Sequence, residues 1–105
     1  MANPLAGEVE VVVNGERCVC KLTLGALAEL EAELGDESLF ALIERFEAGR
    51  YGAGDILALV VAGLRGGGWD GTRETLLSAE IGGGITEAAR VAARLLVGAF
   101  APLGQ

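Results

Sequence analysis

The sequence contains no histidine, and Lys21 is its one lysine. Histidine is the usual general base, the middle member of catalytic triads and a common metal ligand, so these chemistries lack their main side chain. Ser38 and Ser78 are not part of a G-x-S-x-G motif. Lys21 falls on a predicted strand, where it is a poor Schiff-base candidate. We therefore expect no catalytic residue, no cofactor and no enzymatic activity.

Cysteine is also scarce, with only Cys18 and Cys20 in the chain. On a strand, residues two apart point to the same side, with α-carbons roughly 6.5–7 Å apart. That separation is at or beyond the reach of an unstrained disulfide. Because no histidine or further cysteine is available, a tetrahedral zinc site within one chain lacks ligands. We expect two reduced thiols that face a core, and no metal.

The sequence also has no long apolar run and few basic residues. The longest apolar run, Ile56–Leu64, is less than half a membrane span. The N-terminus "MANPLAGEVE" has no basic stretch before an apolar run, so we expect no secretory signal and a cytoplasmic protein. A formal net charge of −7 repels phosphate backbones, which disfavours nucleic-acid binding. Residues 1–50 hold 10 of the 15 acidic residues, which either attract a basic protein partner or only confer solubility.

Glycine, in contrast, is abundant, with 17 residues that lie mostly in clusters. The stretch "GRYGAGDI" leads into a predicted helix start, where backbone N–H groups can hold an anion. It has no G-K-[ST] and no strand before it, as the nucleotide-binding motifs require. The triple glycines at 66–68 and 82–84 lack basic neighbours other than Arg65. We interpret these glycines as helix ends and short connectors.

The first half of the chain begins with the pattern of a β-hairpin. Apolar residues alternate over Glu8–Val13 and again over Arg17–Thr23, on either side of Asn14-Gly15. Asn-Gly is the strongest short hairpin signal, because a type I′ turn needs positive φ at both central positions. A two-residue turn then fixes the register, which is given by three pairs of facing residues: Val11–Cys18, Val9–Cys20 and Glu8–Lys21. The last pair has opposite charges.

The rest of the sequence has helical spacing, interrupted by glycine. Thr23 and Thr72 are predicted caps, and either Asp36 or Ser38 caps the second helix. The first two predicted helices end at about Leu34 and near Gly49, and the third spans about 53–64. The fourth follows Thr72 and ends at about Ala79, and the last begins at Ile85 or Thr86 and ends at about Phe100. The third is apolar almost all the way round, which is typical of a central helix. The expected fold is α+β and mostly α: an N-terminal hairpin (8–23) and about five helices (24–100) in one domain over residues 1–105.

In the helix predicted for "LTLGALAELEAELG", the like-charged Glu29 and Glu33 lie on the face opposite the leucines. Such a pair slightly weakens an isolated helix, so it either contacts a basic partner or is simply solvated. Trp69 either plugs the core or anchors a partner. We define the acidic rim as Glu29, Glu33, Asp36, Glu37, Glu44 and Glu47. The predicted partner-binding residues are Glu29, Glu33, Phe40, Ile43, Glu44, Phe46, Glu47 and Trp69.

Two long stretches carry a family resemblance. "GEVEVVVNGERCVCKLTLGALAELEAELG" and "ESLFALIERFEAGRYGAGDILALVVAGLRGGG" resemble a phage-derived family encoded in gene transfer agent clusters of alphaproteobacteria. The resemblance extends from about Ala2 to Phe100 and includes no catalytic signature. It implies a role in building the tail of a phage-like particle. The family is described as a tail tube protein and is also grouped with phage tail assembly chaperones.

The two descriptions imply different roles. Tube subunits are usually β-rich, whereas this chain offers a single hairpin, so our main expectation is a chaperone that binds the tape measure protein, the tail tube protein or both. A groove between apolar helices would hold an amphipathic helix, and the acidic rim would align a basic target. The chaperone would act in the cytoplasm during assembly. The alternative is a structural tail tube component that stays in the released particle. Self-association also remains open.

Overall fold

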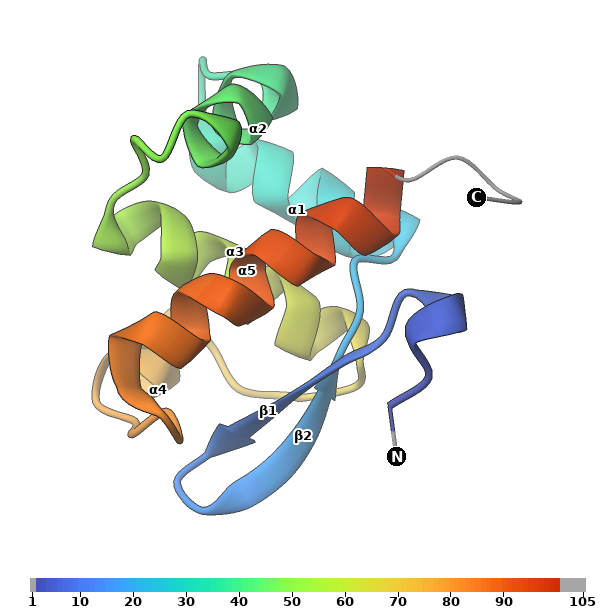
Figure 1. The fold of residues 1–105 in the computed structure, drawn as a ribbon, viewed down its shortest axis with the longest axis vertical. Coiled ribbons are helices and arrows are strands. Elements are labelled where there is room, and N and C mark those ends of the chain that lie inside the picture. The colour runs from blue at the N-terminus through green and yellow to red at the C-terminus, as the bar shows by residue number, and fades with distance from the viewer. Residues whose placement is uncertain (1, 101–105) are drawn as a thin grey trace.

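The computed structural model describes residues 2–100 and has the predicted hairpin followed by five helices (Figure 1). A short 3₁₀ turn, which the sequence did not indicate, precedes the hairpin. The outer ends of the predicted domain, residue 1 and residues 101–105, lie outside the described residues. The elements in chain order are η1 (Pro4–Ala6), β1 (Val9–Val13), β2 (Glu16–Cys20), α1 (Leu24–Leu34), α2 (Leu39–Glu47), α3 (Ala53–Gly66), α4 (Arg73–Leu77) and α5 (Gly84–Phe100).

The hairpin has the predicted turn and register. Asn14 and Gly15 have φ angles of 51° and 81°, as a type I′ turn requires. Val9 pairs with Cys20 and Val11 with Cys18 in an antiparallel sheet. The expected ion pair between Glu8 and Lys21 is not formed among the described residues. The Glu8 carboxylate instead accepts a hydrogen bond from the backbone N–H of Asn3, at 2.8 Å, because η1 folds back beside β1.

Three of the five helices, α1, α2 and α4, begin at capping hydroxyls, as predicted. Thr23 Oγ1 accepts from the Ala26 N–H at 3.1 Å at the start of α1. Ser38, one of the two candidates, caps α2 in the same way, and Thr72 caps α4. Each cap satisfies an N–H group that has no partner within the helix. These local signals set where the helices start.

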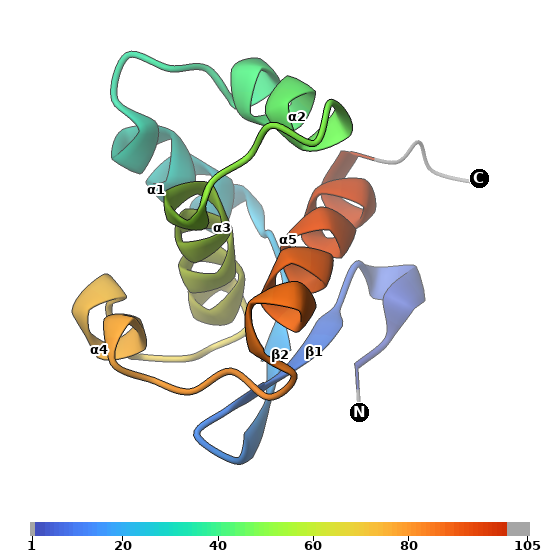
Figure 2. The same cartoon turned by 60° about the vertical axis from the view of Figure 1, so that its left-hand side comes forward.

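Helix α3 lies at the centre of the molecule. It packs against α1, α4, α5 and strand β2 (Figure 2). Helix α5 also contacts strand β1. Leu59, Val60 and Leu64 of α3 are fully buried, which agrees with the apolar character that α3 shows all round. Leu95 of α5 and Leu30 of α1 complete the core from either side. Among the described residues, no helix combines the length and the apolar character that crossing a membrane needs.

The glycines that end α3 allow it to approach strand β2 very closely. A Cβ placed on Gly66 would lie 1.9 Å from the Lys21 carbonyl oxygen, and one on Gly67 would lie 1.8 Å from that of Val19. The Lys21 N–H also donates to the Gly63 carbonyl at 2.8 Å. The interpretation of this cluster as a simple connector was therefore incomplete, because Gly66 and Gly67 are packing positions.

Candidate partner interface

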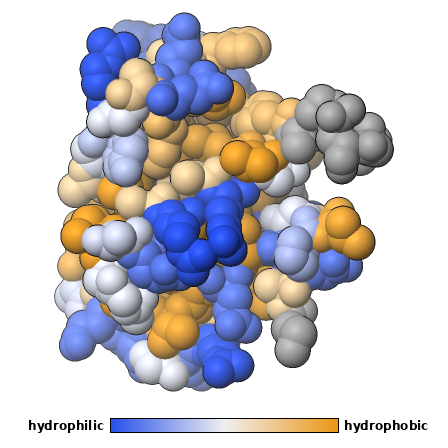
Figure 3. All heavy atoms as spheres, in the orientation of Figure 1, coloured by the Kyte–Doolittle hydropathy of each residue, from blue (hydrophilic) through white to orange (hydrophobic). Residues whose placement is uncertain are grey.

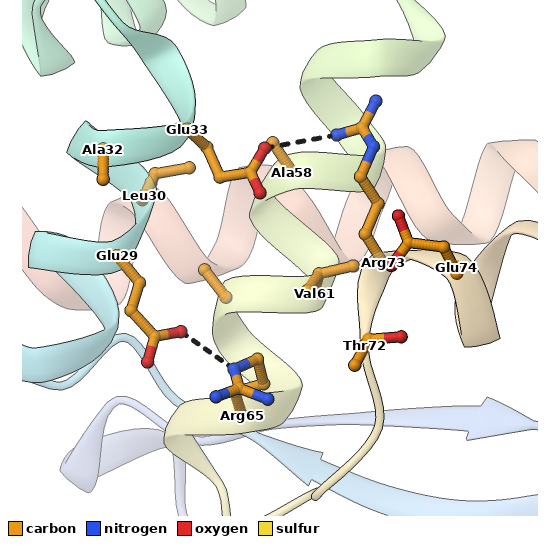
Figure 4. A pocket seen from close by; sticks show the side chains of 11 residues that line it. Glu29, Leu30, Ala32, Glu33, Ala58, Val61, Arg65, Thr72, Arg73 and Glu74 are labelled. Carbon is orange, nitrogen blue, oxygen red and sulfur yellow. Dashed lines mark hydrogen bonds and ion pairs between the residues drawn. The ribbon is translucent and has the colours of Figure 1, made fainter.

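Two of the three acidic residues of α1, Glu29 and Glu33, form ion pairs within the chain. Glu29 Oε1 lies 2.8 Å from Arg65 Nε of α3, and Glu33 Oε2 lies 3.6 Å from Arg73 Nη1 of α4. Figure 4 shows both carboxylates pointing from α1 across a groove toward these arginines. The hydrogen bond from Arg65 holds the pKa of Glu29 below its usual value. These acids therefore connect α1 to its neighbours, and their predicted contact with a partner would compete with the pairs.

This first groove, between α1, α3 and α4, has a volume of about 640 Å³. Its apolar lining includes Leu30, Ala58 and Val61, and Thr72 and Glu74 stand at its α4 side (Figure 4). Because the two ion pairs span the opening, a ligand would have to displace them. The groove is thus a less accessible surface than its volume suggests.

The remaining members of the acidic rim surround α2. Glu37 forms an ion pair with Arg45. Asp36, Glu44 and Glu47 are exposed, and the structure pairs none of the three with a basic side chain in residues 2–100. The acidic rim is therefore half neutralised by the protein's own arginines.

The apolar residues predicted on α2 are divided between two of its faces. Ile43 and Phe46 are partly buried and turn toward α5, whereas the Phe40 side chain is 78% exposed. Phe40 is four and seven residues from Glu44 and Glu47, so these three share an outer stripe of the helix. Of the predicted residues, the structure brings Ile43, Phe46 and Glu47 together.

These three residues form one wall of an apolar groove between α2 and α5. The opposite wall is the C-terminal half of α5, and the groove has a volume of about 400 Å³. On that wall, Val97 is 67% exposed and Phe100 is 46% exposed. A second hollow, of about 450 Å³, lies next to this groove along α5, and Ala93 lines both. The other residues that line the second hollow are Tyr51, Ile56, Ile85, Thr86, Ala89 and Arg90. We call the two together the α5 groove.

Figure 3 shows the molecule from the α5 side. Hydrophobic surface lies below α2, which is at the top of the view, and a hydrophilic area lies in the middle of the view. Arg90 lines the edge of the α5 groove, and Arg94 follows about one turn later along α5. Arg90 donates to both carboxylate oxygens of Glu87, at 2.9 Å each. An apolar channel with a charged border is the usual form of a surface that binds a helix.

A polar network holds the α2 wall in place. The Arg45 guanidinium donates from Nε and Nη2 to the two carboxylate oxygens of Asp55, at 3.2 and 2.7 Å. Asp55 also accepts from the Gly52 N–H at 2.9 Å, which caps α3. The Arg45 hydrogen bond holds the pKa of Asp55 below its usual value. Phe46 stacks on Tyr51 with ring centroids 4.3 Å apart, so α2 is fixed to the start of α3 at two points.

Trp69 lies apart from the α2 residues. Its side chain is partly buried and packs against the core. It shares a crevice with Thr23 and Ala26, at the start of α1, and with Arg65, at the end of α3. Both interpretations, a core plug and a partner anchor, are compatible with this half-buried position.

The sequence did not identify Val97, Phe100, Ile85 and Tyr51 as lining a surface groove. Ile85 and Phe100 share the apolar spacing of the last helix, and this spacing does not distinguish inner from outer positions. Val97 gave a usable signal, because it is an apolar residue less than one turn after Arg94, on the side of the helix that carries Arg90 and Arg94. Tyr51 gave none, since only the fold brings its loop beside α5.

Metal-ligating side chains do not cluster in the part of the chain that the structure describes. Within residues 2–100, no group of three or more His, Cys, Asp or Glu side chains could hold a metal. Cys18 and Cys20 are free thiols. Burial raises the pKa of Cys20 to about 12, so its thiolate is not available near neutral pH. What the surface offers is an apolar groove, which is suited to binding a polypeptide.

Comparison with known protein families gives a match over almost the whole chain. A protein-family model described as phage tail tube protein, GTA-gp10, matches residues 6–102. No curated protein and no solved structure matches the chain. The match confirms the resemblance, and its description names the tail tube, the alternative role, and not the chaperone.

Proposed function

Because the chain belongs to the family of GTA-gp10 phage tail tube proteins, we propose that it is a structural component of the tail tube of a phage-like, gene transfer agent particle. The observation that carries the proposal is the family match, which spans residues 6–102. In this role the protein works by contacting other polypeptides and performs no chemistry.

The α5 groove supports the proposal in physical terms. A tube is a polymer, so each subunit needs surfaces that other chains cover. Val97 and Phe100 expose 67% and 46% of their surface in the groove, and covering them would remove apolar area from water. The groove walls are fixed by the Arg45–Asp55 hydrogen bonds, so little ordering is needed on binding.

A deletion of the gene tests the proposal. We expect cells without the protein to release heads that lack tails, as seen by electron microscopy, and complementation with the wild-type gene to restore tails. Complementation with Val97→Glu should fail, because a charge would enter the groove. Leu77→Glu on α4 is the matched control, since Leu77 is 63% exposed and lines none of the grooves described above. Normal tails in the deletion strain would contradict the proposal.

One structural feature favours a second candidate, a tail assembly chaperone. The described residues contain only two strands of five residues each, which is little sheet for a tube wall. In this role the α5 groove would hold an amphipathic helix of the tape measure protein, and the exposed Glu44 and Glu47 would align its basic residues. A chaperone leaves before the particle is finished, whereas a tube component remains.

The second candidate predicts that the protein co-purifies with the tape measure or tail tube protein before assembly. Val97→Glu should abolish this interaction and Leu77→Glu should preserve it. Charge reversal at Glu44 and Glu47 separates the acidic rim from the groove. If the reversed variant bound as tightly as the wild type, the rim would have no part in recognition.

A further inference from the structure

We infer that the outer edge of β1 binds an extended segment of a different polypeptide, in a hollow between this edge and α5. The hollow has a volume of about 710 Å³, and its lining includes Glu10 and Val12 of β1 and Arg94 of α5. We call it the β1 hollow. It lies on the β1 side of α5, and the exposed Ala93 and Val97 line both this hollow and the α5 groove.

The backbone groups of β1 alternate between its two edges. In a hairpin with a two-residue turn, the residues that flank the turn form a hydrogen-bonded pair, and so does every second pair after it. Val11 and Cys18 are such a pair, so the N–H and C=O groups of Glu10 and Val12 point to the outer edge. The hydrogen bond of 2.8 Å from the Gly82 N–H to the Val12 C=O has this direction.

The chain covers both ends of this edge and leaves its middle open. At one end, Val13 bridges Ile81 in an antiparallel arrangement. At the other end, the Glu8 N–H donates to the Asn3 C=O at 3.1 Å. Between them, neither the N–H nor the C=O of Glu10 has a backbone partner on this side within residues 2–100. The bridge shows that the edge accepts an antiparallel segment, and the open part has room for about three residues.

The open backbone groups of Glu10 select an extended occupant. A helix uses its own N–H and C=O groups internally, so it cannot bond to a strand edge through them. An extended segment offers both groups on the side that faces the edge, as in complexes that add a strand to a sheet.

Helix α5 forms the other wall of the hollow and runs antiparallel to β1 (Figure 1). A Cβ placed on Gly98 would lie 3.2 Å from the Gly7 Cα, and one on Gly82 would lie 2.9 Å from the Val12 Cβ. The C-terminal part of α5 thus lies beside the start of β1. Arg94, which is about one turn before Gly98, lies toward this N-terminal end of the strand.

Unpaired charges of opposite sign line the two walls. Glu10 and Arg94 both line the β1 hollow, and the structure gives neither an ion pair within residues 2–100. Because Val11 faces the core, the Glu10 side chain lies on the opposite face of β1. A residue paired with Glu10 would place its side chain on that face, where a basic group is complementary. The next residue of an antiparallel segment would turn toward α5 and Arg94, where an acidic group is complementary.

This order, a basic residue followed directly by an acidic one, argues against a second copy as the occupant. Arg73-Glu74 is the one place in the sequence where the order occurs. Both residues belong to helix α4, so this chain does not present them in an extended segment. The occupant is therefore a different polypeptide.

Titration of the isotope-labelled, full-length chain with two synthetic peptides tests the inference by nuclear magnetic resonance. The probe is acetyl-GVKEVG-amide, and the control is acetyl-GVEKVG-amide, which has the same composition and the reversed order of charges. We expect the probe to bind at least about tenfold more tightly than the control and to shift the amide signals of Glu10 and Arg94. Equal affinities, or no binding of either peptide, would overturn the inference.

A methyl group on a backbone nitrogen of the probe separates strand pairing from charge attraction. On the lysine it should abolish binding, because this N–H is the one that donates to the Glu10 C=O. On the following glutamate, whose N–H points away from β1, it should change the affinity by no more than about twofold. Equal effects of the two methyl groups would contradict pairing with the β1 edge.

A charge exchange tests the α5 wall. Arg94→Glu should weaken binding of the probe by about tenfold, and acetyl-GVKKVG-amide should bind this variant more tightly than it binds the wild type. Leu77→Glu should bind the probe as the wild type does. Failure of the lysine peptide to prefer Arg94→Glu would overturn the acidic position of the occupant.

Dilution of the wild-type chain without peptide tests the choice of occupant. Amide signals of the β1 hollow should stay unchanged, and signals that shift on dilution would assign the edge to a second copy. These measurements use the purified chain alone, so their outcome is independent of the tube role, which the composition of the particle tests.

Discussion

At the scale of single residues, the contact between Arg45 and Asp55 joins the α2 wall of the α5 groove to α3. Their side chains are only 23% and 20% exposed, and two hydrogen bonds join them. Asp55 also caps α3 through the Gly52 N–H. Loss of this carboxylate should loosen the α2 wall of the α5 groove as well as the start of α3.

We predict that Asp55→Asn lowers the free energy of unfolding at neutral pH by about 1–2 kcal/mol, the usual range for a partly exposed, hydrogen-bonded charge that also caps a helix. The pKa of Asp55 is lower in the folded state than in the unfolded chain. Its contribution is therefore fully present above the unfolded value, about 3.9, and is lost as the pH falls through the folded value.

Thermal unfolding of the two proteins across this acidic range measures the effect. The difference between wild type and Asp55→Asn should be largest at neutral pH and should shrink toward pH values below the folded pKa. Glu44→Gln is the control, because the structure gives the exposed Glu44 no ion pair within residues 2–100. A difference that stayed constant with pH would show that the charge of Asp55 contributes nothing.

At the scale of elements, the contact between the end of α3 and strand β2 depends on glycine. Gly67→Ala would place a methyl group 1.8 Å from the Val19 carbonyl oxygen if nothing moved. We predict a loss of about 2–4 kcal/mol in the free energy of unfolding, because backbone on both sides of the contact must shift.

Gly54, near the start of the same helix, provides the control. A Cβ there would meet no atom within 4 Å. Gly54→Ala should be neutral or should stabilise the protein by up to about 1 kcal/mol, since alanine loses less conformational freedom in a helix. Urea unfolding followed by circular dichroism would measure both variants. Equal stability of the two would contradict the close contact between α3 and β2.

Elements that depend on neighbouring residues were predictable from the sequence. Asn14-Gly15 determines the turn and hence the hairpin register, and the hydroxyls of Thr23 and Thr72 mark helix starts. The ion pair of Glu8 was mispredicted because η1, an unexpected element, supplies the competing N–H of Asn3. Local patterns thus yielded the elements and the alternation of inner and outer residues.

The groove and the ion pairs were not predictable, because they join residues far apart in the sequence. Glu29 and Arg65 are 36 positions apart, and no sequence pattern links them. The two walls of the α5 groove come from α2 and α5, which are far apart in the sequence. Ile43 and Phe46 could be recognised as apolar, but whether they face the core, a groove or a partner depends on the whole fold.

At the scale of the whole molecule, one exposed apolar groove combines with a compact helical body. The net charge of −7 keeps single chains apart, so assembly must rely on a specific surface. The α5 groove is the described surface best suited to this purpose. Its α2 wall is held to the start of α3 by the Arg45–Asp55 hydrogen bonds.

We predict that particle yield follows the groove and not general stability. Cells that express Val97→Glu should release fewer tailed particles than cells that express Leu77→Glu, although the two purified variants unfold at similar temperatures. Counting tailed and tailless heads by electron microscopy makes the comparison. Equal yields would mean that the groove has no role in tail formation.

The central claim is that this chain is a component of the finished tail. Quantitative mass spectrometry of purified gene transfer agent particles, with isotope-labelled peptides of this protein and of a head protein, tests it most directly. The tube role predicts that the chain is present in many copies per particle and in a fixed ratio to the head protein. Its absence from particles whose tails are intact would contradict that role.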